Sequence, residues 1–156
     1  MRAYTPNLAA VPDICHCLAL RKANRHLTQL YDRHLAPVGL RITQLSILAR
    51  LRHLGPCGMQ PLAADLVMDR TTLGRNLGPL EREGLVAHTA DPRDRRARLL
   101  TLTEAGTARL EAAMALWAEA QRAFEAAFGE TEARELRGTL GRLAATPFEP
   151  AAAPAG

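Results

Sequence analysis

Aromatic residues are scarce in this sequence: they make up only 4% of its 156 residues, whereas apolar residues as a whole make up 47%. A hydrophobic core with so few aromatic rings must consist mainly of leucine and alanine, and these residues fit helices better than a β-sandwich. A chain of this length can form one ordinary domain around a single sizeable core. The composition therefore predicts one mainly helical domain.

Long apolar segments, a secretion signal and a cysteine framework are also missing. No run approaches the roughly 18 apolar residues of a membrane-spanning helix, and the N-terminal residues lack a clean apolar stretch followed by a cleavage site. Three cysteines are too few and too irregularly spaced for a disulfide scaffold or a zinc site. His16, His26 and His34 do not share one helical face. These absences predict a reduced, cytoplasmic protein with no metal and no cofactor.

Lysine is nearly absent, because Lys22 is the only lysine among 20 basic residues. The net charge is +4, and the basic excess lies in residues 1–98, whereas residues 99–156 hold five basic and eight acidic side chains. Arginine can bond a phosphate or a guanine through two N–H groups at once. Charge alone is equally compatible with a basic protein that binds no polyanion, so the motifs have to decide.

Four helices are predicted in the first half by apolar residues that recur three or four positions apart. The first begins at Asp13 and the second has Thr43 as its cap. A short third helix has Pro61 in its first turn, and the fourth begins at the N-cap Asp69 and runs to about Glu83. The apolar stripe of the first helix is Cys17, Leu20, Ala23, Leu27, Tyr31 and Leu35.

The apolar period changes after residue 84. Residues 85–89 and 98–102 are typical of two short strands, and the turn-forming residues 91–94 between them predict a hairpin. Thr103 is predicted to cap a long helix that ends at Gly129, and Thr131 starts a last helix. The stripes of these two helices are Leu110, Met114, Trp117, Ala120, Phe124 and Phe128, and then Leu136, Leu140 and Leu143.

This order of elements predicts a winged helix-turn-helix, mainly α with a small β-hairpin wing. The terminal helices carry more apolar surface than so small a lobe can cover, which predicts a homodimer. We expect a flexible arm at residues 1–12, dimerisation helices at 13–36 and 103–145, and a winged helix-turn-helix lobe at 43–102. The Pro/Ala-rich residues 147–156 are expected to be a disordered tail.

Several short motifs in this order resemble the MarR family of bacterial regulators. They are Leu62-Ala63, the stretch LEREGLV at residues 80–86, Asp91, the sequence Asp94-Arg95-Arg96, and LTEAG at residues 102–106. The resemblance extends over about residues 13–145. It implies a sequence-specific DNA-binding transcriptional regulator, acting as a homodimer on a pseudo-palindromic operator of double-stranded DNA. Such regulators are commonly repressors that a small, often aromatic or phenolic, effector releases from DNA by occupying a cleft between the dimer helices and the DNA-binding lobe.

The fourth predicted helix has the residues that a DNA-recognition helix needs near its N-terminus. These candidates are Arg70, Thr71, Thr72, Arg75 and Asn76. Arginine pairs with guanine, asparagine pairs with adenine, and a threonine methyl can contact a thymine methyl. Pro79 departs from a regular helix because it removes one backbone bond. Either the helix bends at Pro79, or tertiary packing holds its last turn.

The predicted hairpin tip concentrates positive charge at Arg93, Arg95, Arg96 and Arg98, with Asp94 among them. The family resemblance implies that Arg96 enters the minor groove of DNA and that Asp94 orients it. A narrow minor groove has a negative potential that attracts arginine. Arg93 and Arg95 are expected to contact phosphates, which position the protein without specifying the sequence.

Cys17 allows two interpretations. The organic-peroxide-sensing branch of the family has a reactive cysteine followed by Arg, Thr and Tyr, and Arg25, Thr28 and Tyr31 match that spacing. Two further tyrosines of that branch are absent, because Arg21 and Ile42 occupy the matching positions. Cys17 is then either a thiol redox switch or a small apolar residue on the dimer stripe.

Two other classes of function would need different residues. An enzyme with Cys17 or Cys57 as nucleophile would need a base, an orienting carboxylate and an oxyanion loop, and the sequence offers only His53 near Cys57. The sequence therefore predicts no catalysis. A winged-helix protein-interaction module without DNA binding is the other alternative, and the retained arginines of the wing argue against it.

Overall fold

The computed structural model describes residues 14–94 and 97–148, and it divides into two units at residue 120, inside one long helix. The first unit contains α2 (His16–Leu35), η2 (Ala36–Val38), α3 (Ile42–Leu54), α4 (Met59–Asp65), α5 (Arg70–Arg82), β1 (Val86–Ala90), β2 (Arg98–Leu102) and the start of α6 (Glu104–Phe128). The second unit contains the end of α6 and α7 (Glu130–Ala145). This mainly helical architecture with one two-stranded antiparallel hairpin confirms the predicted fold class.

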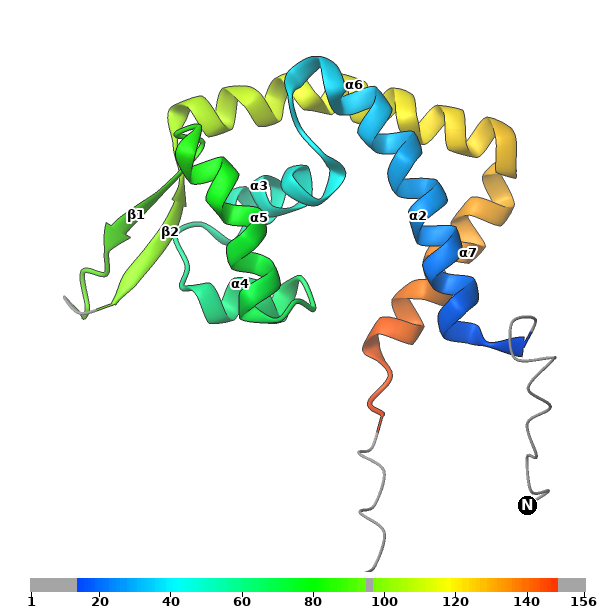
Figure 1. The fold of residues 1–156 in the computed structure, drawn as a ribbon, viewed down its shortest axis with the longest axis horizontal. Helices are drawn as coiled ribbons and strands as arrows, with labels where there is room; N and C mark the ends of the chain where they lie inside the picture. Colours follow the sequence, from blue (N-terminus) through cyan, green and yellow to red (C-terminus); the bar gives the residue numbers. More distant parts are fainter. Residues whose placement is uncertain (1–13, 95–96, 149–156) are drawn as a thin grey trace, which may run out of the picture. The chain divides into compact units, whose positions relative to one another are not determined.

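Leucine dominates the core of the first unit, as the composition predicts. The side chains that are buried almost completely are Leu35, Ile47, Leu48, Leu51, Leu62, Leu73, Leu77, Leu80, Leu85 and Leu100. Each contributes roughly 1.5–3 kcal/mol through the removal of apolar surface from water. Figure 1 shows where this core lies: α3, α4 and α5 gather beside the β1–β2 hairpin, and α6 begins at the end of β2.

The start of α3 differs from the sequence-based prediction. Thr43 is not the cap, because the helix begins two residues earlier than predicted, at Ile42, with Arg41 in the N-cap position. The Gln44 side chain accepts a hydrogen bond from the Arg41 N–H at 2.9 Å, and the Asp32 carboxylate accepts one from the Ile42 N–H at 2.8 Å. A carboxylate ten residues upstream thus satisfies a free N–H of this helix, which removes the need for a threonine cap.

The recognition-helix candidate α5 continues through Pro79 as a single helix. Leu77 and Leu80, on either side of the proline, are buried in the core, so tertiary packing holds the last turn. The chain then leaves the helix at Gly84, whose φ of 69° lies in the left-handed region that glycine adopts without strain. The sequence left open whether the helix bends at Pro79 or its last turn is held by packing, and the structure shows the second arrangement.

The hairpin pairs Val86 with Leu102 and Ala90 with Arg98, one residue later on the first strand than predicted. Cys57 forms an additional bridge to Leu100, with backbone N–O distances of 3.2 and 2.8 Å. This bridge joins the segment between α3 and α4 to the base of the wing. The tip residues Arg95 and Arg96 lie outside the described residues.

Thr103 caps α6 as predicted, because its hydroxyl oxygen accepts the Gly106 N–H at 2.9 Å. In the second unit, α7 begins at Glu130 rather than at Thr131, with Gly129 (φ 100°) in the N-cap position. The rings of Phe124 and Phe128 stack with centroids 5.2 Å apart. The tail expected at 147–156 is described only as far as Phe148, and the arm expected at 1–12 lies outside the described residues.

Candidate DNA-binding surface and adjoining cleft

Asp69 fixes the N-terminus of α5. Its carboxylate accepts hydrogen bonds from the Thr72 backbone N–H at 2.8 Å and from the Thr72 hydroxyl at 2.6 Å. These bonds hold the pKa of Asp69 below its usual value, and the bond from the hydroxyl has a larger effect than the bond from the backbone N–H. A carboxylate at this end of a helix also faces the positive end of the helix dipole. The first turn of α5 is therefore rigidly defined.

The five predicted base-reading residues differ in how available their side chains are. Arg70, Thr71, Thr72 and Arg75 are exposed, whereas Asn76 is half-buried. The Asn76 amide donates to the Thr72 carbonyl at 2.9 Å, and the Thr72 hydroxyl is held by Asp69. Thr71 and Arg75 thus form the outward edge of α5, opposite the buried leucines, and Arg70 is exposed in the first turn of the helix.

The described part of the wing tip is exposed at Arg93 and Asp94. The Asp91 carboxylate accepts the Arg93 N–H at 2.8 Å, and the Asp91 N–H donates to the Ala97 carbonyl at 3.1 Å. A second tie lies at the base of the wing, where the His88 ring is 2.9 Å from the Glu81 carboxylate of α5. Sequence reasoning missed this His88–Glu81 pair, because the two residues belong to different elements.

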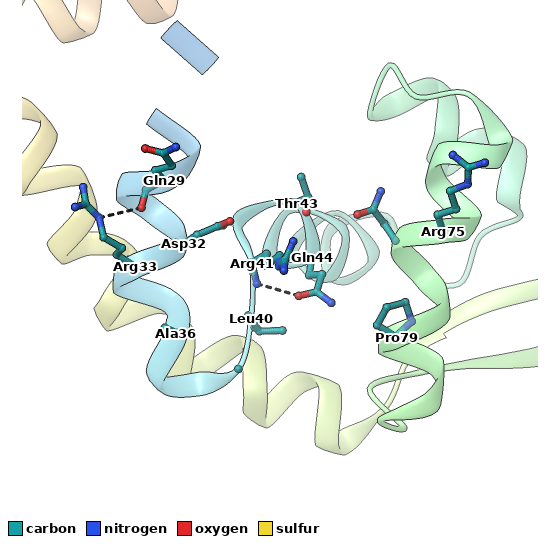
Figure 2. Close-up of a pocket in the computed structure, with 12 residues that line it drawn as sticks. Gln29, Asp32, Arg33, Ala36, Leu40, Arg41, Thr43, Gln44, Arg75 and Pro79 are labelled. Atoms are coloured by element: carbon teal, nitrogen blue, oxygen red, sulfur yellow. Dashed lines mark hydrogen bonds between the residues drawn. The ribbon is translucent and has the colours of Figure 1, made fainter. Parts of the chain in front are cut away.

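A cleft of about 1020 Å³ opens between α2, α3 and α5 in the first unit (Figure 2). Its lining residues are Gln29, Asp32, Arg33, Ala36, Gly39, Leu40, Arg41, Thr43, Gln44, Arg75, Asn76 and Pro79. In Figure 2, Arg41 and Gln44 lie between α2 and α5, whereas the Arg33 side chain turns back to donate to the Gln29 carbonyl at 3.2 Å. Two predicted base-reading residues, Arg75 and Asn76, are thus also cleft residues.

The chemistry of the cleft is polar and weakly positive. Three arginines, Arg33, Arg41 and Arg75, face one carboxylate, Asp32, which already accepts the Ile42 N–H. No aromatic side chain belongs to its lining, so the described residues offer no ring-stacking partner to a ligand. The amides of Gln29, Gln44 and Asn76 can both donate and accept hydrogen bonds.

The three cysteines differ in environment. Cys15 occupies the N-cap of α2, and its sulfur accepts the Leu18 N–H at 3.4 Å. Cys17 is exposed on α2. Burial, and then the nearby charge of Asp65, raise the pKa of Cys57, which disfavours its nucleophilic thiolate. Within residues 14–94 and 97–148, no group of three His, Cys, Asp or Glu side chains is arranged for a metal ion, and no helix is long and apolar enough to cross a membrane.

Comparison with known proteins agrees with this architecture. A sequence model of the MarR family matches residues 40–97, from just before α3 to the tip of the wing. The transcriptional regulator MosR of M. tuberculosis is 38% identical to this chain. The match covers 85% of this chain and 97% of the MosR chain, and the two structures superpose with a TM-score of 0.71. A probable transcriptional regulator from Pseudomonas aeruginosa is 36% identical over 84% of this chain and 98% of its own, with a TM-score of 0.76. This chain belongs to the MarR family.

A further relative in sequence is the transcriptional repressor NicR of Pseudomonas putida. It is 32% identical over 93 residues, which are 60% of this chain and 59% of NicR. The matched stretch therefore spans less than two thirds of that repressor.

The MarR motifs of this chain are explained mostly by structure. Leu62 and Leu85 are buried, and Gly84 supplies the left-handed turn that ends α5. Gly106 lies so close to the hairpin that a Cβ there would stand 2.0 Å from the Leu85 carbonyl oxygen. Thr103 donates to the Gly84 carbonyl at 2.7 Å while capping α6. These residues join the end of α5, the base of the hairpin and the start of α6.

Proposed function

We propose that this MarR-family protein binds operator DNA as a homodimer and represses transcription until a small molecule releases it. The observation that carries the proposal is the two-sided character of α5: Leu73, Leu77 and Leu80 are buried, whereas Thr71 and Arg75 are exposed on the opposite edge and Arg70 is exposed in the first turn. Such a helix is held firmly from behind while it presents hydrogen-bond donors to a groove. MosR, at 39% identity, and CouR, at 26% identity, have both been solved in complex with DNA.

Base reading would be divided among the residues of this edge. Arg70 and Arg75 can each bond guanine through two N–H groups, and the Thr71 methyl can meet a thymine methyl. Asn76 would have to exchange its bond to the Thr72 carbonyl for a bond to adenine. Thr72, whose hydroxyl is held by Asp69, would shape the helix end and add its methyl group.

The wing would add contacts beside the recognition helix. Arg93 is exposed next to the turn that Asp91 stabilises, and we assign it to a phosphate. Asp94, Arg95 and Arg96 follow, and we assign Arg96 to the minor groove, with Asp94 orienting it and Arg95 on a phosphate. Each phosphate that is neutralised adds roughly 0.9 to the slope of log K against log salt.

The dimer would form through the terminal helices, at residues 13–36 and 103–145. Leu20 on α2, Met114 on α6, and Leu140 and Leu143 on α7 are large apolar side chains that the single chain leaves exposed. A second copy of the chain would cover them and place two recognition helices one helical turn of DNA apart.

The α2–α3–α5 cleft is our assignment for the effector site. CouR has been solved with p-coumaroyl-CoA, a phenolic thioester with a strongly anionic carrier. Because Arg75 and Asn76 line the cleft of this chain, an occupant would contact two residues that are needed for base reading. Release from DNA would then require no long-range signal. We further propose that this regulator works in the cytoplasm and has no catalytic role.

Fluorescence anisotropy on a labelled duplex from upstream of the protein's own gene tests the proposal. Arg75→Ala and Asn76→Ala should each weaken binding by about 1–3 kcal/mol and reduce the preference over a scrambled duplex. Arg52→Ala is the matched control for Arg75→Ala, because it also removes one positive charge from an exposed arginine. Arg52 lies on α3, outside α5, and pairs with Glu111 at 3.0 Å. An equal effect of all three variants on both duplexes would refute base reading by α5.

A further inference from the structure

The turn between α4 and α5 contains a strained residue. Val67 has a φ of 52°, and among the described residues it is the only non-glycine with a positive φ. Its N–H donates to the Ala64 carbonyl at 3.1 Å, and the Met68 N–H donates to the Ala63 carbonyl at 2.8 Å. This pair of bonds is the helix-ending motif whose left-handed position strongly favours glycine. A β-branched side chain is among the least suited to that position.

The Val67 side chain gains nothing from packing in exchange for this strain. It is 78% exposed, the highest value among the large apolar side chains that the structure describes. The neighbouring Met68 is half-buried and packs against the core, so Met68 anchors the turn. Strain and solvent exposure are both unfavourable to the folded chain, and strained residues that persist in this way cluster at binding sites.

The place of Val67 in the fold indicates what covers it. The residue precedes the cap Asp69 by two positions, and the exposed residues Arg70 and Thr71 of α5 follow the cap directly. Val67 therefore lies at the N-terminal end of the helix whose exposed residues we assign to DNA. Apolar side chains contact thymine methyl groups in the major groove, and the edges of deoxyribose offer a similar apolar surface.

We propose that Val67 is a DNA-contact residue, which places its isopropyl group against an apolar edge of the operator at the entry of the recognition helix. The proposal rests on the DNA-binding function inferred above. It explains why a residue that destabilises the turn is present: binding, not folding, uses its side chain.

The test exploits the opposite signs of the two effects. Val67→Gly and Val67→Asn both suit a left-handed residue, so each should raise the melting temperature, by roughly 2–4 °C if about 1 kcal/mol of strain is relieved. Each should at the same time weaken binding to the upstream duplex roughly three- to tenfold, through the loss of buried apolar carbon. Leu54→Gln, at an exposed apolar residue near the end of α3, is the control and should leave binding unchanged.

A second arm identifies the contacted group. Replacing thymine by uracil in the duplex removes the methyl group, so a loss of wild-type affinity that Val67→Asn does not share assigns the contact to thymine. An equal effect of uracil on wild type and on Val67→Asn, with the variants still weakened on both duplexes, assigns it to deoxyribose. The proposal would be overturned if Val67→Gly and Val67→Asn were stabilised but bound DNA as well as wild type. It would also be overturned if the two variants lost both stability and DNA affinity. If the wild-type protein binds no upstream duplex, the DNA-binding function itself fails, and that result is distinguishable from the others.

Discussion

Gly106 offers the most direct test of how the wing is held. It is buried near the start of α6, and a Cβ at this position would lie 2.0 Å from the Leu85 carbonyl oxygen and 2.8 Å from the Leu102 Cδ1. Leu85 immediately precedes β1 and Leu102 ends β2, so Gly106→Ala would push α6 away from the hairpin. The backbone oxygen cannot rotate out of the way as a flexible side chain could.

The magnitude follows from three contributions. Alanine in a helix is favoured over glycine by about 0.5–1 kcal/mol. Overpacking against fixed atoms costs about 1–3 kcal/mol, and displacement of the Leu85 carbonyl weakens the bond that it accepts from the Thr103 N–H at 3.2 Å, at about 0.5–1.5 kcal/mol. We therefore expect Gly106→Ala to lower the free energy of unfolding by about 1–3 kcal/mol.

Urea unfolding, followed by circular dichroism, measures this change. Gly74→Ala is the matched control, because Gly74 is also helical but no atom lies within 4 Å of its added Cβ. That control should be more stable than wild type by about 0.5–1 kcal/mol. A Gly106→Ala protein as stable as the Gly74→Ala protein would refute the close packing of α6 on the hairpin.

Four further predictions follow from other parts of the molecule. A hydrogen bond from Arg50 is the main cause that lowers the pKa of Asp65, and a hydrogen bond from Thr72 is the main cause that lowers the pKa of Asp69. The two ionised carboxylates therefore stabilise the folded chain above the ordinary carboxyl pKa, and this stabilisation is lost as the pH falls below about 4. Acid titration of stability should show this loss, and Asp65→Asn together with Asp69→Asn should flatten it; an unchanged acid limb would contradict the assignment. Arg96→Ala should leave folding and dimerisation intact but cost most of the operator affinity and reduce the salt slope by about one unit, whereas tighter binding by Asp94→Ala would disprove an orienting role for that carboxylate. Sedimentation at low micromolar concentration should give about twice the 16.9 kDa chain mass, and a monomer would rule out the two-fold DNA complex. Organic hydroperoxide should release the wild type no more readily than Cys17→Ser; release of the wild type alone would make Cys17 a redox switch.

Local signals in the sequence were sufficient for most of the elements. The Asp69 cap, the Thr103 cap and the two strands of the hairpin depend on residues within a few positions of one another, and the structure confirms them, with the first strand displaced by one residue. The start of α3 was mispredicted because Asp32, on the preceding helix, accepts the Ile42 N–H, and no short motif records such a contact.

Features that arise from tertiary packing were not predictable from the sequence. Arg75 and Asn76 were recognised as base-reading candidates, but only the packing of α3 against both α2 and α5 places them at the cleft. The apolar stripe of α2 was predicted as one continuous surface, yet Tyr31 and Leu35 are buried within the chain while Cys17 and Leu20 are exposed. The strain at Val67 is a backbone property, because valine at this position looks like any other residue of a turn.

Selection of binding sites from a pool of random DNA duplexes is the most direct test of the central claim, which is sequence-specific operator binding through α5. We expect enrichment of a two-fold symmetric site whose half-sites lie about one helical turn, roughly 10–10.5 base pairs, apart. We also expect Arg75→Ala to lose the preference at one position in each half-site while retaining the others. A pool that yields no common sequence, or a site that the variant reads unchanged, would contradict sequence-specific binding through α5.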